Sequence, residues 1–569
     1  AVTIADCCNA GLIDAPAIWK TGNTTIQKAS GIVGEFSGVY DATVTHCLSV
    51  GTINNAVAAR AQDCEYVGYL MASATLSLTQ NYYDNQVAGS TSAHGALSTA
   101  RLTGGDALDG FDTDVWLFSA GYYPRLRCFA DEPAALLCAT PFLLADNEKH
   151  DKVKSDFTVS DNDGVAWTLS DNAQATLNGT VVTVTRGERA TQVTLTATLD
   201  DFARQSMITV YPDVFAGSGT ADDPFLIDDY ADLQRLSTAT NADGLTFDGD
   251  YLLVTQDIDL GGDTGFAGMS RGEATPFLGT LNGGGHSLRN LYMRNDLTKT
   301  EWGGLFGYVG AAGAITDLTI ADDANIGLYL NGGTLAAQSE GRLERVSVLT
   351  PVLHSAAGAG RFGGLVGTLT ATGAVTDCYV GSDIALSGAA NTVGGLVAYS
   401  YGTLDGCQYA GTVGGSAASY VGGLTAENYG TITDCLASGD VAGQTYVGGV
   451  TARCMTYGTR QPAISHTLCT AQVTYSAQVD CAGAVTGYVD GTFDSVWYDV
   501  QIGVLDYRTA DGLTPRTTRE IIAGWDGGSR WTVTDDTRYP QLARFAGQPA
   551  AVLYSVPLTC ADGEARNDL

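Results

Sequence analysis

The sequence contains no run of about 18 apolar residues, so no segment of it predicts a helix that crosses a membrane. Its first residues, AVTIADCCNAG, lack the basic and apolar regions of a signal peptide, and we expect any targeting or anchoring segment to lie outside this sequence. Basic residues are few: 29 Lys and Arg stand against 62 Asp and Glu, giving a formal net charge of -33. So acidic a chain repels nucleic acid and anionic lipid, and we expect no nucleic-acid partner and no membrane insertion.

The usual signatures of metal and cofactor sites are also missing. None of the 13 Cys forms a CxxC pair matched by a second CxxC or by a His pair, and the six His lack metal-ligand spacing. The stretch GTLNGGGHSL is glycine-rich, but it has neither the Lys-Ser/Thr of a P-loop nor GxGxxG spacing. We therefore predict no catalytic residue, no metal and no cofactor.

A phrase of about 30 residues recurs through the second half of the chain. Six copies begin at Trp302, Asn331, Phe362, Val393, Val421 and Val447, at steps of 29, 31, 31, 28 and 26 residues. Each copy has two short apolar runs separated by Gly, Asn, Asp and Ser, a pattern typical of strands and turns. A unit this short cannot bury its own apolar face unless it stacks on copies of itself. The repeat therefore predicts an all-β fold built on a parallel β-solenoid.

Stacking in register predicts columns of like side chains. One column is expected to run inside the solenoid through Leu318, Val346, Cys378, Cys407, Cys435, Thr467 and Val496. Its three thiols are interpreted as small apolar core residues, with a disulfide such as Cys407–Cys435 as the alternative. Paired glycines are expected at corners where backbones pack closely. Tyr401, Tyr429 and Tyr457, each followed by Gly, are expected to stack at a turn.

These units resemble the GLUG motif of bacterial surface proteins, named for its Gly-Leu-any-Gly core. The resemblance rests on Gly304-Leu305-Phe306-Gly307 and Gly364-Leu365-Val366-Gly367; later copies, such as Gly423-Leu424-Thr425-Ala426, replace the second Gly. The resemblance implies a β-solenoid and by itself implies no activity.

The first 127 residues repeat the end of the second half. NYYDNQ resembles VWYDVQ, and the segments around Phe111 and Trp116 match those around Trp525 and Trp531. His46 and His466 occupy matching places beside the inner column, which predicts a shared turn role. We expect both tails to be caps that close the C-terminal end of a solenoid with bulky aromatics.

The likeness between the two halves continues beyond these tails and predicts the domain order. EPAALLCATPFLLAD resembles QPAAVLYSVPLTCAD, and the first copy continues into alternating strands that resemble bacterial immunoglobulin-like domains. We predict the C-terminal part of one solenoid with its cap at 1–127 and an immunoglobulin-like sandwich at 128–213. A complete GLUG-type solenoid follows at 214–546, with a helix after Asp228 or Asp229 capping its first coil, and 547–569 begin a second sandwich.

Further residues are candidate sites. Asp257 and Asp259 alternate onto one face and are interpreted as solvated carboxylates, with a calcium site as the alternative; Asp222 and Asp223 form a second carboxylate pair. The 27 Tyr and 7 Trp could stack on sugar rings where they are exposed. Asn178 matches a glycosylation acceptor pattern.

Together these features predict a non-enzymatic repeat segment of a large bacterial protein at the cell surface, acting as an adhesin or stalk. The expected partner is a protein or glycan ligand, or a second molecule joined end to end. One alternative is a structural filament assembled by edge-strand addition, and another is a β-helix carbohydrate-active enzyme.

Overall fold

The computed structural model describes residues 2–9, 13–15, 19–21, 24–26, 42–50, 53–55, 76–84, 87, 95–142, 152–162, 164–272, 275–294, 303–328, 331–354, 360–386, 392–415, 417–458, 460–476, 481–502, 510–533 and 537–557. The chain divides into two compact units, Ala1–Val214 and Phe215–Leu569, and each is described by itself.

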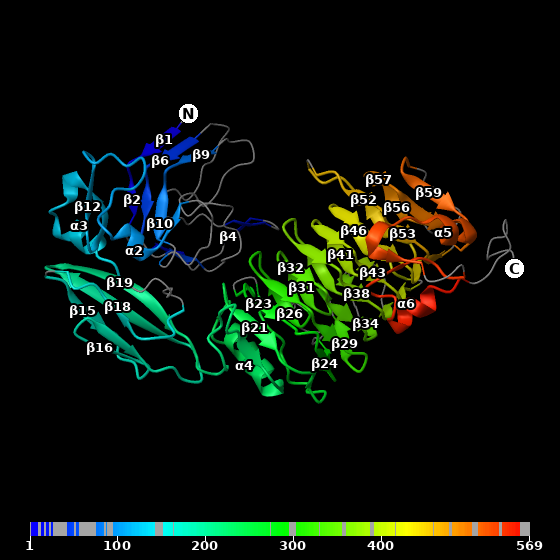
Figure 1. The fold of residues 1–569 in the computed structure, drawn as a ribbon, viewed down its shortest axis with the longest axis horizontal. Helices are drawn as coiled ribbons and strands as arrows, with labels where there is room; N and C mark the ends of the chain where they lie inside the picture. Colours follow the sequence, from blue (N-terminus) through cyan, green and yellow to red (C-terminus); the bar gives the residue numbers. More distant parts are fainter. Residues whose placement is uncertain are drawn as a thin grey trace. The chain divides into compact units, whose positions relative to one another are not determined.

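The second unit is a parallel β-solenoid, in which strands from successive coils pair to form five parallel sheets (Figure 1). The β20 sheet contains β20 (Phe225–Ile227), β21 (Tyr251–Val254), β23 (Thr280–Asn282), β27 (Ala314–Thr316), β32 (Arg342–Glu344), β37 (Ala374–Thr376), β42 (Thr403–Asp405), β47 (Thr431–Thr433), β52 (Ala463–Ser465) and β57 (Thr492–Asp494). The β22 sheet contains β22 (Ile258–Asp259), β24 (Ser287–Arg289), β28 (Thr319–Ile320), β33 (Ser347–Val348), β38 (Tyr379–Val380), β43 (Gln408–Tyr409), β48 (Leu436–Ala437), β53 (Leu468–Cys469), β58 (Val496–Asp499) and β59 (Leu513–Arg516).

Three shorter sheets contribute strands to some of the coils. The β25 sheet contains β25 (Tyr292–Arg294), β29 (Asn325–Leu328), β34 (Val352–His354), β39 (Ile384–Leu386), β44 (Thr412–Gly414), β49 (Asp440–Gly443) and β54 (Gln472–Tyr475). The β26 sheet contains β26 (Phe306–Val309), β31 (Ala336–Ser339), β36 (Val366–Leu369), β41 (Val397–Ser400), β46 (Thr425–Asn428), β51 (Thr451–Cys454) and β56 (Thr486–Val489). The β30 sheet contains β30 (Asn331–Gly333), β35 (Arg361–Gly363), β40 (Thr392–Gly394), β45 (Tyr420–Gly422), β50 (Tyr446–Gly448) and β55 (Cys481–Gly483).

The predicted inner column is confirmed. Its seven residues, from Leu318 to Val496, are all buried, none with more than 1% of its surface exposed. Each follows a corner residue at positive φ, a region that Gly, Asn and Asp tolerate better than most residues. The corner residues are Asp317, Arg345, Asp377, Gly406, Asp434, His466 and Ser495.

The paired glycines pack closely between coils, as predicted. A Cβ on Gly395 would clash with the carbonyl oxygen of Gly423, its counterpart in the next coil. The same holds for Gly364 against Gly395 and for Gly423 against Gly449. The stacked backbones therefore leave no room for a side chain at this position.

One predicted register is wrong by one residue. The repeated letters align Asn331 with Phe362, but in the structure Asn331 pairs with Arg361 and Gly333 with Gly363. Thr334 then stands where the next coil has Gly364. The prediction aligned Gly332-Gly333 with Gly363-Gly364 because the two pairs have the same sequence.

The first coil is capped by a helix, as predicted. Helix α4 (Tyr230–Asn241) follows β20, and its N-cap is Asp229, whose carboxylate accepts a hydrogen bond from the Asp232 N–H at 3.1 Å. Leu233 and Leu236 of α4 are buried. A capped amphipathic helix thus packs at the start of the stack.

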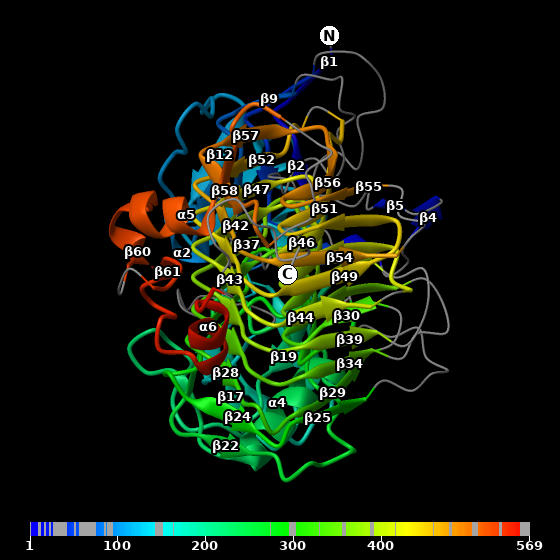
Figure 2. The same cartoon turned by 90° about the vertical axis from the view of Figure 1, so that its right-hand side faces the viewer.

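The sequence predicts that the aromatic tail closes the end of the solenoid, and in the structure the tail also lies along the side of the stack. After β59 it forms α5 (Thr518–Gly524), η2 (Gly528–Arg530), β60 (Trp531–Thr532), β61 (Gln541–Leu542) and α6 (Pro549–Tyr554). Figure 2 shows these elements on the flank of the coils. Phe545 stacks on Tyr379 at 5.2 Å, and both belong to a buried cluster with Leu436 and Leu468. The tail therefore covers the outward column of the β22 sheet across several coils.

The predicted strand after residue 547 is also corrected. Residues Pro549–Tyr554 form helix α6, and residues 558–569 lie outside the described part of the chain. The apolar run PAAVLY fits a strand as well as a short helix, and the Pro at the first helical position favours the helix.

The first unit begins with parallel strands of the same kind. Its two main parallel sheets contain β1 (Val2–Ala5), β6 (Ala42–Thr45) and β9 (Leu76–Thr79), and β2 (Cys8–Asn9), β7 (Leu48–Ser49), β10 (Tyr82–Asp84) and β11 (Ala96–Leu97). Two small sheets contain β3 (Ile13–Ala15) with β8 (Ile53–Asn55), and β4 (Trp19–Thr21) with β5 (Thr24–Ile26). A tail follows with α2 (Thr99–Leu102), β12 (Trp116–Ser119), β13 (Tyr122–Leu126), η1 (Arg127–Phe129) and α3 (Pro133–Cys138).

Two three-stranded antiparallel sheets complete the first unit. They contain β14 (Phe157–Thr158), β17 (Val181–Val184) and β16 (Ala175–Asn178), and β15 (Ala166–Leu169), β18 (Thr191–Leu199) and β19 (Phe202–Val210). Val182, Leu195 and Ile208 from the two sheets lie in one hydrophobic core. These six strands are called the six-stranded unit below.

The two aromatic tails match in detail, as their sequences predict. The rings of Phe111 and Trp116 lie 4.7 Å apart, and those of Trp525 and Trp531 lie 4.9 Å apart. Tyr82 contacts Phe111 at 5.6 Å, as its counterpart Trp497 contacts Trp525 at 5.3 Å.

Candidate functional site

A cluster of tyrosines and charged residues gathers on two neighbouring sheets of the solenoid. Its members, here called the tyrosine face, are Tyr399, Tyr401, Tyr420, Tyr429, Tyr446, Tyr457 and Tyr488, with Arg361, Glu427 and Arg453. In the β26 sheet, Tyr399, Glu427, Arg453 and Tyr488 occupy one rung position in four successive coils. The face thus exists because equal positions of the repeat lie over one another.

The rings stack along the solenoid axis. Tyr420 and Tyr446 are parallel to within 5°, with centroids 5.5 Å apart. Tyr401 and Tyr429 are parallel to within 8° at 4.7 Å, and Tyr457 meets both edge-on at 5.7 and 5.8 Å. The predicted Tyr401–Tyr429–Tyr457 column is therefore confirmed, and Tyr457 is its exposed member, with 61% of its surface accessible.

Two arginines lie over these rings. The Arg361 guanidinium is 4.1 Å from the Tyr399 centroid, and that of Arg453 is 4.5 Å from Tyr420 and 5.5 Å from Tyr446. Cation–π contact of this kind stabilises each arrangement by about 0.5–1 kcal/mol at exposed sites. The arginines thereby hold the rings in fixed orientations.

A buried carboxylate connects the two tyrosine stacks. Glu427 forms an ion pair with Arg453 and accepts a hydrogen bond from the Tyr429 hydroxyl. Burial, and then the hydrogen bond to Glu427, raise the pKa of Tyr429. Burial alone would lower the pKa of Arg453, but the hydrogen bond and charge of Glu427 outweigh it and raise that pKa. Both groups thus keep their protons, and this arrangement suits binding rather than proton transfer.

The sequence predicted one of the stacks and missed the other. Tyr420 and Tyr446 immediately precede Val-Gly-Gly in successive copies, a signal that the repeat alignment contained. The contacts of Arg361 and Arg453 could not be predicted from the sequence, because each contacts a tyrosine that belongs to another coil.

The predicted carboxylate pair serves to hold turns. Asp257 accepts a hydrogen bond from the Ser287 N–H at 2.9 Å, and Asp259 accepts bonds from Asn290 and from the Gly261 N–H, each at 2.8 Å. The Asn290 bond is the main cause of the lowered pKa of Asp259. Among the described residues, no group of three or more His, Cys, Asp or Glu is placed to hold a metal ion.

The histidines and cysteines take structural positions where they are described. His46 and His466 both occupy the left-handed corner, with φ of 53° and 43°, which confirms the shared turn role. Cys378, Cys407 and Cys435 are free thiols in the core, so the disulfide alternative is not formed here. Burial raises the pKa of Cys378 and Cys435, and thiols held protonated are poor nucleophiles. His94 and His150 lie outside the described residues.

Comparison with known proteins gives two likenesses. No protein-family model matches the chain. An alignment 240 residues long, which covers 38% of this chain, shows 32% identity to Halomucin of Haloquadratum walsbyi, and this chain spans about 2% of the length of Halomucin. A solved structure of a candidate immunoglobulin A1 protease from Bacteroides ovatus aligns with this chain at a TM-score of 0.39 and 16% identity. The alignment covers 58% of this chain and 94% of the protease chain. Within the described residues, none of the helices is both long and apolar enough to cross a membrane.

Proposed function

We propose that this chain is a non-enzymatic segment of a large extracellular surface protein, in which the solenoid serves as a stalk and the tyrosine face as an adhesive surface. The observation that carries the stalk role is the continuous parallel ladder, ten strands long in each of two sheets. Each coil adds length through backbone pairing, and like side chains stack without interruption.

Three further features support this proposal. The likeness to Halomucin favours a surface or secreted protein, in agreement with the location that the sequence predicts. The six-stranded unit, with two antiparallel sheets around one core, suits an immunoglobulin-like spacer beside GLUG-type coils. A net charge of -33 keeps such a protein soluble when many copies are crowded together.

For the adhesive role, we propose a glycan as the ligand. Tyrosine rings offer apolar faces of the size of a sugar ring, together with hydroxyl groups that bond to water or ligand. Tyr457 and Tyr488 are exposed, and Tyr446 contacts Tyr488 at 6.2 Å, so ring surface and arginine charge lie side by side. An acidic glycan would also meet Arg453, although Glu427 already neutralises part of that charge.

A glycan array probed with the purified chain tests this role. We expect binding that falls at least tenfold in Tyr457→Ala and in Tyr488→Ala. The matched control is Tyr251→Ala, which removes a tyrosine of β21 that lies outside the face and is 40% exposed, close to the 36% of Tyr488. Equal binding by all three variants would remove the tyrosine face from consideration, and cleavage of any array polysaccharide would contradict the non-enzymatic role.

The filament alternative has one supporting observation. Among the described strands, β1 is the terminal strand of its sheet and pairs with β6 on one side. A strand at the end of a sheet can pair with a strand from another molecule. Electron microscopy at increasing protein concentration separates the two roles, because the stalk predicts isolated particles and the filament predicts fibres.

A further inference from the structure

Helices α3 and α6 are equivalent elements of the two tails, related by an offset of 416 residues. Each has Pro at its first position, Pro133 and Pro549, and each is followed by a carbonyl that accepts the same hydrogen bond. Tyr123 N–H donates to Ala139 O at 2.8 Å, and Tyr539 N–H donates to Ser555 O at 2.9 Å. What surrounds α3 therefore indicates what the corresponding surface of α6 is built to contact.

In the first unit, α3 is covered by the six-stranded unit. Leu137 is 2% exposed and belongs to the same core as Val193 and Ile208. Arg204 from β19 donates from Nη1 to Cys138 O at 2.8 Å and to Thr140 O at 2.9 Å, and from Nη2 to Val50 O at 3.3 Å. One buried guanidinium thus joins the tail, the coil and the six-stranded unit, because it satisfies carbonyls from separate segments.

Among the described residues, the corresponding surface of α6 has exposed apolar side chains. Leu553, the counterpart of Leu137, is 68% exposed, and Val556, the counterpart of the fully buried Thr140, is 51% exposed. Apolar side chains this exposed beside a buried cluster mark a contact surface. In the described part of the chain, no antiparallel unit packs on α6 as the six-stranded unit packs on α3, although the two helices occupy equivalent places in their tails.

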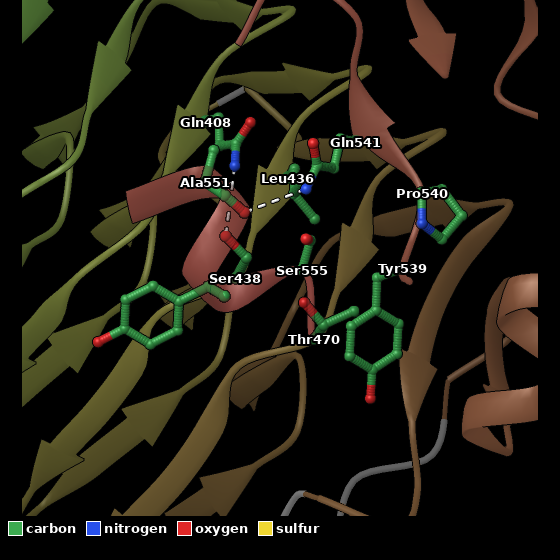
Figure 3. A pocket seen from close by; sticks show the side chains of 10 residues that line it. Gln408, Leu436, Ser438, Thr470, Tyr539, Pro540, Gln541, Ala551 and Ser555 are labelled. Atoms are coloured by element: carbon green, nitrogen blue, oxygen red, sulfur yellow. Dashed lines mark hydrogen bonds between the residues drawn. The ribbon is translucent and has the colours of Figure 1, made fainter. Parts of the chain in front are cut away.

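A narrow pocket beside α6 (Figure 3) is lined by counterparts of residues that surround Arg204 in the first unit. Its lining includes Thr470, Tyr539 and Tyr554, the counterparts of Val50, Tyr123 and Cys138, together with Leu436, Gln408 and Ala551. Thr470 corresponds to Val50 because Leu468 and Leu48 occupy the same ladder position, each one coil after Leu436 and Cys8. The backbone segments that surround the Arg204 guanidinium in the first unit therefore have equivalents around this pocket.

Two buried oxygen atoms in this pocket, one amide carbonyl oxygen and one hydroxyl oxygen, are able to accept a hydrogen bond from a cationic donor. The side chains of Gln408 and Thr470 are 0% and 5% exposed, and within the described structure Gln408 Oε1 and Thr470 Oγ1 have no hydrogen-bond partner. Leaving such an atom unpaired costs about 1–3 kcal/mol. A cationic donor entering the pocket would remove that cost.

We propose that this pocket is an arginine socket, and that its occupant is a six-stranded antiparallel unit of the same kind as residues 152–210, presenting an Arg from the strand equivalent to β19. The apolar face of Leu553 and Val556 then becomes part of the core of that unit, as Leu137 does in the first unit. The occupant is a separate copy of this type of unit, because Arg204 is already held by its own tail. This contact between α6 and a six-stranded unit does not depend on a ligand at the tyrosine face.

The test extends the full chain by its own six-stranded unit. Residues 154–214 are appended after Leu569, which lies 416 residues beyond Val153 and so reproduces the spacing of the first unit. The appended copy carries Met207→Leu, a change at an exposed position that gives its peptides a distinct mass. Hydrogen exchange of residues 549–556 is followed by mass spectrometry, with residues 133–140 of the same molecule as the internal reference.

We expect α6 to exchange at least tenfold more slowly in the extended chain than in the original chain, approaching the rate of α3. Replacing the arginine of the appended copy by Ala should return α6 to the fast rate, while the appended β18–β19 peptides stay protected. Unchanged exchange of α6 beside a protected appended unit would overturn the socket. Protection that persists without the arginine would also overturn it.

Discussion

The backbone N–H of Cys407 points to the sulfur of Cys435, one coil further along the solenoid, at 3.3 Å. Val346 N–H meets Cys378 Sγ in the same way at 3.4 Å, so one contact repeats along the inner column. Each sulfur also lies near the carbonyl two residues before it, as Cys435 Sγ does to Thr433 O at 3.1 Å. The thiols therefore pair with backbone groups along the axis and stay reduced in the core.

This arrangement predicts how the three thiols react. Cys378, Cys407 and Cys435 are fully buried, so iodoacetamide should leave them unmodified in the native protein while it modifies the exposed Cys128. After unfolding in guanidinium without reductant, all three should take the label. Peptide mass spectrometry measures both states, and unlabelled Cys407 and Cys435 after unfolding would indicate a disulfide instead.

Much of the solenoid could be predicted because its period places equal residues over one another. The inner column, the shared turn role of the two histidines and the capping helix after Asp228 or Asp229 were each predicted from a local pattern. The course of the tail could not be predicted, since nothing in a non-repeating segment says which face of the stack it covers. Tyr379 and Leu436 receive the tail, yet in the sequence they resemble other strand residues. For the tyrosine face, the sequence predicted the column of Tyr401, Tyr429 and Tyr457. It did not predict the contact of Arg453 with Tyr420, because these two residues come together only when the coils stack.

Gly395→Ala should destabilise the solenoid strongly. The added methyl group would clash with the Gly423 carbonyl and with the Tyr409 ring, and the stacked backbones cannot move apart without breaking the ladder. We expect the free energy of unfolding to fall by about 3 kcal/mol, at the upper end for overpacking. Urea unfolding followed by circular dichroism measures the change. Gly547→Ala is the control, since a methyl group there meets nothing within 4 Å; equal losses in both variants would contradict the close-packed corner.

The left-handed corner predicts opposite effects of two substitutions at His466. Its φ is 43° and its side chain is exposed, so His466→Gly should relieve backbone strain and leave stability unchanged or higher. His466→Val should cost about 1–2 kcal/mol, because a branched side chain resists this conformation. Thermal unfolding of the two variants provides the comparison. A valine variant as stable as the glycine variant would show that the corner is not under this constraint.

Alkaline pH should loosen the tail. Burial raises the pKa of Tyr379 to about 12, above its ordinary value of 10.0. The unfolded chain therefore releases this proton first, and stability that is complete below pH 10 is lost as the pH rises towards 12. Tyr379→Phe removes the hydrogen bond from the Ala551 N–H, at 3.1 Å, and should lower stability at pH 8 while making the loss between pH 10 and 12 shallower. Urea midpoints across this range test it, with Tyr457→Phe as the exposed control; an unchanged slope in Tyr379→Phe would refute the assignment.

A buried carboxylate accepts equivalent hydrogen bonds in each of the two tails. The same substitution can therefore be tested twice in one molecule. Asp499 accepts hydrogen bonds from Thr518 Oγ1 and the Tyr539 hydroxyl, both at 2.5 Å, and from the Gln501 N–H at 2.8 Å. Asp84 accepts bonds from Thr99 Oγ1 at 2.7 Å and from the Tyr123 hydroxyl at 2.6 Å. Because donors converge on one acidic side chain, the carboxylate fixes the start of the tail against the last coil.

Asp499→Asn should release the second tail, since the amide brings an N–H group to a place where donors already meet. A buried donor left unpaired costs about 1–3 kcal/mol, and we expect faster hydrogen exchange across residues 518–545 with little change in the earlier coils. Asp84→Asn should have the same local effect across residues 99–126, and each variant serves as the control for the other tail. If either substitution left its own tail protected, the carboxylate would not be what holds the tail to the coil.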